Sequence, residues 1–184
     1  MIPPGWVRQG PAVWEELAAG VLLEIFQSML EEKYKSTLTD LINEELDSGK
    51  VFCFAVSTLS MLPLIKPEDE IVVRRDPLNT LRRGDIVVFQ RYGELYTHRL
   101  LCRRMSGSKI TLVTKGDNSL IADDPISEKD LLGKVIEIRK GNKSFNLEGE
   151  FWKIANSLAG TVSYLEWTVY SLLRGLRRLI PKLQ

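Results

Sequence analysis

The sequence predicts an α+β protein in which a mostly β core of bent antiparallel sheets carries helical extensions at both ends. Short apolar segments separated by turn residues recur over residues 51–145. Apolar residues at helical spacing occupy the flanking regions instead. We therefore expect an N-terminal helical segment over 1–50, a β core over 51–145 and a C-terminal amphipathic helix over 146–184.

Length and composition describe an ordinary globular protein. The 184 residues suffice for one core with helical additions. A net charge of +1 gives no overall attraction to nucleic acid, which we do not expect as a partner. Cys53 and Cys102 lack metal-ligand spacing, so we expect two reduced thiols and neither a metal nor another cofactor.

The N-terminal segment has the pattern of an amphipathic helix from Pro11 to Tyr34, followed by a shorter helix over residues 41–46. Thr37 or Thr39 is a candidate N-cap of the second helix, and Gly49 would end it. The first thirty residues lack the basic region and cleavage site of an export signal, and acidic residues interrupt any spanning run. We expect a cytoplasmic protein whose N-terminal helices are packing elements.

The β core begins with an apolar segment from Val51 to Val56 that ends in a hydroxyl cluster before Pro63. This break places Ser60 at a strand end. Thr58 lies two residues earlier, on the same face of an extended chain, where its hydroxyl would face a reacting carbonyl. Serines near turns more often satisfy local backbone groups, so this segment alone leaves both interpretations open.

Short β segments with turn residues between them follow at regular intervals and predict a small, bent, mostly antiparallel sheet or barrel. The expected strands cover residues 70–74, 85–91, 95–102, 109–114 and 133–139.

The C-terminal helix carries its apolar residues on one face. They are Ile154, Leu158, Ala159, Val162, Leu165, Val169, Leu172, Leu173 and Leu176. Four cations at its end, Arg174, Arg177, Arg178 and Lys182, complement the helix dipole, or, with nearby Trp and Tyr residues, mark an interfacial helix. We expect this helix to dock peripherally on a membrane or on a partner protein rather than span a bilayer; the alternative is that its apolar face covers the β core.

The one histidine, His98, lies in the strand-like run 95–101, and a tight turn at 114–118 is followed by Asp123 and Asp124. A lone histidine is more often structural, and carboxylates near turns often cap the local backbone. Serine, histidine and aspartate thus occur in one chain, but a catalytic triad is recognised by geometry and not by order.

Four sequence blocks within residues 57–139 resemble the catalytic core of the type I signal peptidases. They are SMLP at 60–63, like the S-M-x-P nucleophile box; RGDIVVF at 83–89, like the G-D-I-V-x-F strand; THRL at 97–100, like the H-R-V/I box; and TKGDN at 114–118 with Asp123-Asp124, like the T-K-G-D-N-N…D-D loop. The histidine resembles the archaeal and endoplasmic-reticulum branch, where histidine replaces the lysine base of most bacterial signal peptidases and of LexA-type repressors.

This resemblance implies a serine endopeptidase that cuts an extended peptide or protein after a small residue. Ser60 would be the nucleophile and His98 the base, supported by Asp124, with Asp123 as the fallback. The Thr58 hydroxyl and the Ser60 backbone N–H would hold the oxyanion. Asp117 would brace its loop through backbone hydrogen bonds.

The chain departs from the resemblance by having amphipathic helices where the family has a spanning helix, and by one extra residue before Asp123-Asp124. Two alternatives stay open. One is a non-catalytic peptide-binding module on the same fold. The other is LexA-like self-cleavage, because Ala18-Ala19-Gly20 resembles the Ala-Gly site of those repressors.

Overall fold

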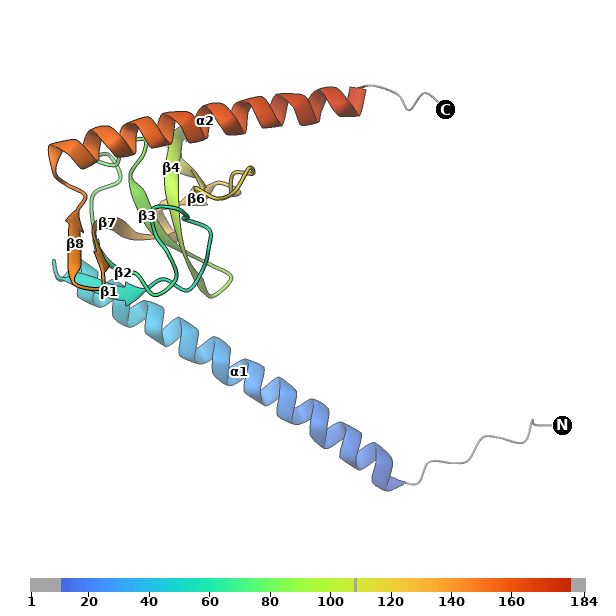
Figure 1. Cartoon of the computed structure of the whole chain (residues 1–184). Coiled ribbons are helices and arrows are strands. Elements are labelled where there is room, and N and C mark those ends of the chain that lie inside the picture. Colours follow the sequence, from blue (N-terminus) through green and yellow to red (C-terminus); the bar gives the residue numbers. More distant parts are fainter. Residues whose placement is uncertain (1–10, 108, 180–184) are drawn as a thin grey trace. The chain divides into compact units, whose positions relative to one another are not determined.

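The computed structural model describes residues 11–107 and 109–179 (Figure 1). The chain divides into two compact units, and the boundary falls between Asp40 and Leu41, inside helix α1 (Pro11–Asp47). Helix α1 is continuous where the sequence predicted two helices. The hydroxyls of Thr37 and Thr39 donate to the carbonyls of Lys33 and Lys35 four residues earlier, so these threonines are accommodated within the helix instead of capping a new one.

In the first unit, the described apolar side chains of α1 are largely exposed. Six of them are 51% to 65% exposed: Val21, Leu22, Ile25, Phe26, Met29 and Leu30. The end of α1 belongs to the second unit, where Ile42 and Leu46 are buried and Gly49 ends the helix with φ +81°.

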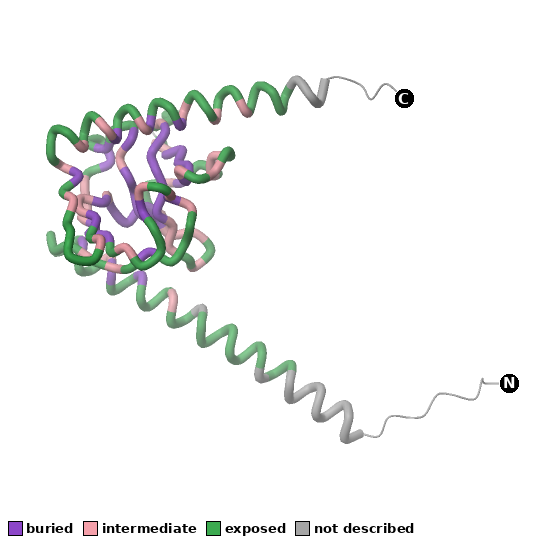
Figure 2. Tube along the Cα trace, in the orientation of Figure 1, coloured by how far each residue is buried: buried purple, intermediate pink, exposed green. Residues whose placement is uncertain are grey.

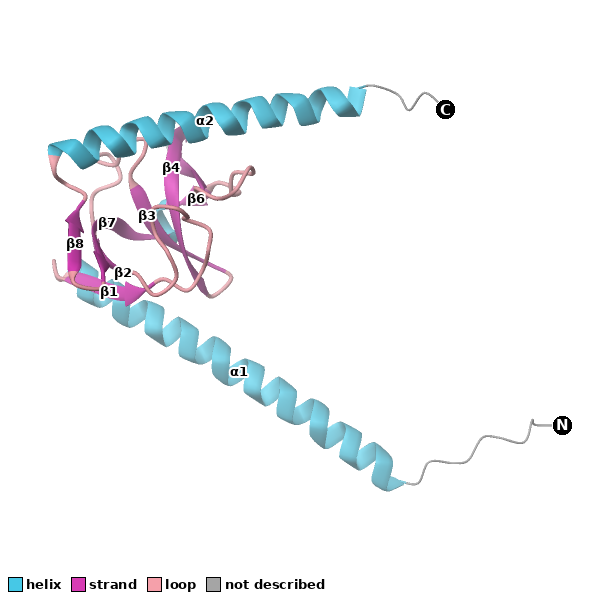
Figure 3. Cartoon of the chain, in the orientation of Figure 1, coloured by secondary structure: helices cyan, strands magenta, loops and turns pink. Residues whose placement is uncertain are grey.

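The second unit is built on an eight-stranded antiparallel sheet (Figure 3). The strand order is β1-β2-β7-β3-β4-β5-β6, with β8 paired to β7. The strands are β1 (Val51–Ala55), β2 (Glu70–Arg74), β3 (Ile86–Arg91), β4 (Glu94–Ser106), β5 (Lys109–Lys115), β6 (Ile126–Ser127), β7 (Leu131–Lys140) and β8 (Lys143–Asn146). A short 3₁₀ helix (Glu128–Asp130) precedes β7. The predicted α+β class with a mostly antiparallel core is confirmed.

The sheet buries both of its faces around β3. Ile86 and Val88 belong to one apolar cluster, whereas Val87 and Phe89 belong to another. Burial on both faces explains why this strand reads as a continuous apolar run without alternation. The register shifts at three places, which bends the strands: Val72/Val73, Val88/Phe89 and Leu100/Cys102.

Helix α2 (Glu150–Leu179) packs on the core through small and polar residues. Asn156, Gly160 and Ser163 are buried, and α2 contacts β4. Apart from half-buried tryptophans and tyrosines, among them Trp152 at the core, the large apolar residues described in α2 are exposed, as the mostly green tube of α2 in Figure 2 illustrates. The alternative that the apolar face covers the β core is therefore wrong, because the opposite face makes that contact. Within the described residues, no helix has both the length and the apolarity that crossing a bilayer requires.

Candidate active site

Ser60 lies in the turn that follows β1, and buried neighbours fix that turn. Met61 and Ile65 are fully buried, and the Ile65 N–H donates to the Met61 carbonyl at 3.0 Å. Ser60 itself is half-buried. The apolar anchor next to it holds the Ser60 hydroxyl at the surface of the core.

His98 lies in β4, opposite Val87 of β3, and is 8% exposed. The Phe89 and Tyr96 rings meet the imidazole edge to face, each with a centroid distance of 5.9 Å. His98 Nδ1 lies 2.7 Å from Asp123 Oδ2. Two aromatic rings and one carboxylate thus set the orientation of the imidazole.

Asp123, and not Asp124, is the carboxylate within hydrogen-bond distance of His98. Asp123 is fixed at the end of β5, where its N–H donates to the Thr114 carbonyl at 2.8 Å and its Oδ2 accepts from Thr114 Oγ1 at 2.7 Å. Asp124 is exposed, and its carbonyl accepts from Arg91 Nη2 at 2.6 Å. The preference for Asp124 is therefore reversed, because pairing with Thr114 directs the Asp123 side chain to His98.

Gly116 lies next to both Ser60 and His98, at a position where any larger residue would crowd them. A Cβ on Gly116 would lie 3.2 Å from Ser60 Cβ and 3.2 Å from His98 Nε2, and only 2.7 Å from the Ser60 carbonyl oxygen. Serine and imidazole thus adjoin the same point of the backbone. The glycine leaves the space between them open.

The Thr58 hydroxyl lies beside the candidate nucleophile, with Oγ1 3.1 Å from Ser60 Oγ. The loop at 114–118 is tied to the same turn, since the Asn118 N–H donates to the Ser60 carbonyl at 2.8 Å and Asn118 Nδ2 donates to the Leu59 carbonyl at 3.3 Å. The structure thus brings Thr58, Ser60, His98 and Asp123 into one region.

Asp117 braces the loop through a side-chain ion pair and not through the backbone bonds expected for it. Arg99 Nε and Nη2 donate to its two carboxylate oxygens, each at 2.7 Å. Arg99 is 1% exposed, and its Nη1 also donates to the Gly84 carbonyl at 2.8 Å and to Asn156 Oδ1 at 3.0 Å. Successive strand residues face opposite sides, so His98 faces the site while Arg99 anchors the strand from behind.

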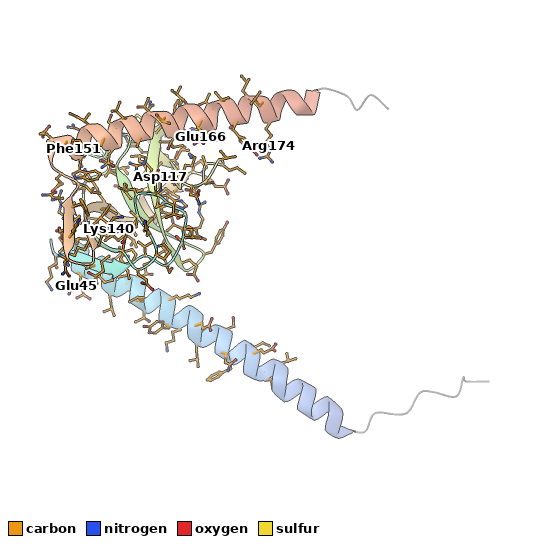
Figure 4. All side chains as sticks on the ribbon, viewed as in Figure 1. Glu45, Asp117, Lys140, Phe151, Glu166 and Arg174 are labelled. Atoms are coloured by element: carbon orange, nitrogen blue, oxygen red, sulfur yellow. The ribbon has the colours of Figure 1, made fainter. Side chains whose placement is uncertain are left out.

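Lys115 is a second fully buried cation next to the site. Its Nζ donates to Glu166 Oε2 at 3.0 Å, to the Ser119 carbonyl and, at 3.4 Å, to the Gly116 carbonyl. Figure 4 labels Glu166 on α2 and Asp117 in the loop below it. Helix α2 therefore contacts the loop that carries Gly116 through an ion pair.

Sequence reasoning missed Arg99, Lys115, Asn156 and Glu166. Two signals were available. Arg99 and Lys115 interrupt strongly apolar strands, where a charge needs a partner, and Glu166 is the one acidic residue of the sequence after Glu150.

The geometry suits acyl transfer. An imidazole whose Nδ1–H pairs with a carboxylate can accept a proton at Nε2. Here Nε2 and Ser60 Cβ both lie close to Gly116, and the Thr58 hydroxyl lies beside that of Ser60. Among the described residues, no group of three His, Cys, Asp or Glu side chains could hold a metal ion.

Comparison with known proteins identifies a family. The model of a family described as Peptidase S24-like matches residues 11–136, more than half of the chain. No curated protein matches the chain. The matched range includes Thr58, Ser60, His98 and Asp123, and it ends before α2.

Proposed function

The chain belongs to the Peptidase S24-like family, and from this premise we propose that it is a serine endopeptidase with Ser60 as nucleophile, His98 as general base and Asp123 as the carboxylate that orients His98. The observation that carries the proposal is the 2.7 Å contact between His98 Nδ1 and Asp123 Oδ2, with Nε2 at the glycine that separates it from Ser60. This contact supports a Ser/His mechanism like that of the archaeal and endoplasmic-reticulum signal peptidases.

In the proposed reaction, Ser60 Oγ attacks the scissile carbonyl while His98 Nε2 takes the hydroxyl proton. The tetrahedral intermediate collapses to an acyl ester on Ser60 as His98 returns the proton to the departing amine. Water, deprotonated by His98, then attacks the ester, and His98 returns this proton to Ser60 Oγ as the C–O bond breaks and the acid is released. The Ser60 N–H and the Thr58 hydroxyl stabilise the oxyanion in both halves.

The competing base is Lys115, because LexA-type enzymes use a lysine. Lys115 Nζ donates to the Glu166 carboxylate and to two carbonyl oxygens. These contacts engage Lys115 in holding α2 and the loop together, which favours His98 as the base.

The proposed substrate is an extended peptide that pairs with β1. Strand β1 stands at one end of the strand order and, among the strands that the structure describes, pairs only with β2. It leads directly into the Ser60 turn, so a peptide added along its open edge would pass the nucleophile. Affinity would come from the peptide backbone, and we propose a small residue before the scissile bond by analogy with signal peptidases.

The test combines a fluorophosphonate probe with a peptide library. We expect the probe to label the native chain and not Ser60→Ala, and library cleavage to disappear in Ser60→Ala and His98→Ala. Asp123→Asn should lower kcat/KM by up to about 10⁴-fold, as loss of a triad carboxylate does. The adjacent, exposed Asp124→Asn is the matched control and should retain activity.

Four outcomes would contradict this assignment. Full activity of His98→Ala would exclude histidine as the base, and a larger loss in Asp124→Asn than in Asp123→Asn would reverse the carboxylate assignment. Equal labelling of Ser60→Ala and the native chain would show that Ser60 is not the labelled nucleophile, and absence of labelling in the native chain would favour a non-catalytic binding module. Acceptance of bulky residues before the cut would remove the proposed specificity alone.

A further inference from the structure

Helix α2 turns small and polar residues toward the core and large apolar residues outward, the opposite of a typical surface helix. Its core-facing positions include Asn156 and Ser163, at 7% and 8% exposure, and buried Gly160. In the described part of α2, eight large apolar residues are 53% to 73% exposed; this set, the outer apolar face, is Phe151, Ile154, Leu158, Val162, Leu165, Val169, Leu172 and Leu173. Such a contiguous exposed stripe marks an interaction surface.

Specific contacts prevent α2 from turning this stripe inward. A Cβ on Gly160 would lie 2.6 Å from the Gly84 Cα, so only glycine fits where helix and core meet. Asn156 and Glu166 accept from Arg99 and Lys115. Rotation of the helix would leave both cations, at 1% and 0% side-chain exposure, without these partners, which is costly. The core itself therefore imposes the exposure of the outer apolar face.

We propose that the outer apolar face lies on the surface of an anionic lipid bilayer, with α2 parallel to the membrane plane. The face extends from Phe151 to Leu173, on the order of 30 Å at the rise of an α-helix. Figure 4 labels Phe151, the first residue of the face, and Arg174, which directly follows the last one. Helices that lie in the interface bury one apolar face in this manner.

Charge identifies the lipid as anionic. Arg174 is exposed and directly follows Leu173, the last residue of the face, in the sequence. The sequence continues with Arg177, Arg178 and Lys182 and has no acidic residue after Glu166. Clustered cations beside an amphipathic helix are attracted to phosphatidylserine-like or phosphatidylglycerol-like headgroups.

A second copy of the chain fits this face less well. Helix pairs usually select each other through charged residues beside the apolar seam, whereas Ser157, Thr161 and Thr168 flank this one. Parallel copies would bring the basic ends together. Antiparallel copies would bring the basic end to Glu150, which already pairs with Lys153 at 2.7 Å.

The experiment is sedimentation of the full chain with phosphatidylcholine vesicles, with and without about a third of phosphatidylglycerol. We expect the native chain to bind only the anionic vesicles. The double variant Leu158→Glu/Val162→Glu should bind them at least about tenfold more weakly, because charge on the inserted face opposes insertion. The control is Met105→Glu, at an apolar residue that is 77% exposed outside the face; it should bind like the native chain. Point substitutions are preferable to deletion of α2, which would remove the partners of Arg99 and Lys115.

The native chain, the double variant and Met105→Glu should have the same circular dichroism spectrum and the same Tm, because the changed residues are exposed. Equal vesicle binding by the double variant would overturn the proposal, and so would loss of binding in Ile25→Glu of α1 but not in the double variant. Absence of vesicle binding, with dimerisation of the native chain in sedimentation velocity that the double variant abolishes, would identify a second copy as the occupant and also overturn it. The readout is independent of peptidase activity.

Discussion

At Gly116, an added side chain would directly disturb the proposed reaction. Gly116→Ala would place a methyl group 3.2 Å from both Ser60 Cβ and His98 Nε2 and 2.7 Å from the Ser60 carbonyl. Displacement of about 1 Å between reacting groups can cost about 100-fold in rate. We expect kcat/KM to fall by about that factor while circular dichroism stays native.

The matched control for Gly116→Ala is Gly149→Ala, where the nearest atom to the new Cβ would be 3.6 Å away, an ordinary contact. It should leave activity unchanged. Native activity of Gly116→Ala would show that serine and histidine do not need the close approach that the structure gives them.

The sequence was sufficient to single out Ser60, His98, Thr58 and an aspartate pair, because each belongs to a block of recognisable residues. It could not decide between Asp123 and Asp124. Neighbouring side chains diverge, and only the backbone bonds of Asp123 to Thr114 determine which carboxylate meets His98. The Arg99 and Lys115 networks depend on Asn156 and Glu166, 57 and 51 residues away along the chain, so no local pattern predicted them.

At the scale of elements, the ion pair between Lys115 and Glu166 joins α2 to the loop that carries Gly116. Lys115 is fully buried, whereas the Glu166 side chain is 44% exposed. Water can replace part of the lost interaction, so Glu166→Gln should lower the free energy of unfolding by about 1–2 kcal/mol, less than a fully buried pair would lose. Urea unfolding measures this difference.

Glu150→Gln on the same helix is the comparison for Glu166→Gln, since Glu150 pairs with Lys153 at the surface. We expect a smaller loss of unfolding free energy than in Glu166→Gln, because water screens this exposed pair. Equal effects of the two substitutions would mean that α2 is not held by the buried lysine.

The segment before α2 is anchored by Arg74, whose guanidinium donates to Glu148 at 2.8 Å and 2.9 Å. These hydrogen bonds hold the pKa of Glu148 below its usual value of 4.5, although burial opposes the shift. A carboxylate with a lowered folded-state pKa stabilises the fold above its unfolded pKa, and this contribution is lost as the pH falls through the folded pKa. Glu148→Gln should therefore lower Tm at neutral pH, and the Tm difference from the native chain should disappear as the pH falls below 4.5 and through the lowered folded-state pKa of Glu148. Parallel Tm curves across this range would exclude the linkage.

At the scale of the whole molecule, strands with apolar runs were predictable and polar ones were not. The predicted strand 70–74 coincides with β2. The observed strands β3 (86–91), β5 (109–115) and β7 (131–140) differ from the predicted ranges by one or two residues at an end. The structure adds β6, with two residues, and β8, Lys143–Asn146. Strand β8 is mostly exposed and polar, so its pairing with β7 defines it, and no pattern in its own sequence does.

The face of α2 that meets the core was unpredictable for a related reason. An apolar stripe ordinarily marks the buried side of a helix. Here glycine contact and hydrogen bonding to two buried cations outweigh that tendency. The stripe was correctly located in the sequence, but its environment depends on partners that only the folded chain supplies.

The helical conformation of Ala18-Ala19-Gly20 opposes self-cleavage at this segment. These residues lie in the continuous helix α1, whereas a peptidase binds its substrate extended, so the helix would have to unwind locally. We expect the chain to stay intact during prolonged incubation at several pH values, as measured by intact mass. A fragment that begins at Gly20 in the native chain and is absent from Ser60→Ala would contradict this expectation. A rate of its appearance independent of protein concentration would then assign the cut to the same molecule, because cleavage between molecules accelerates with concentration.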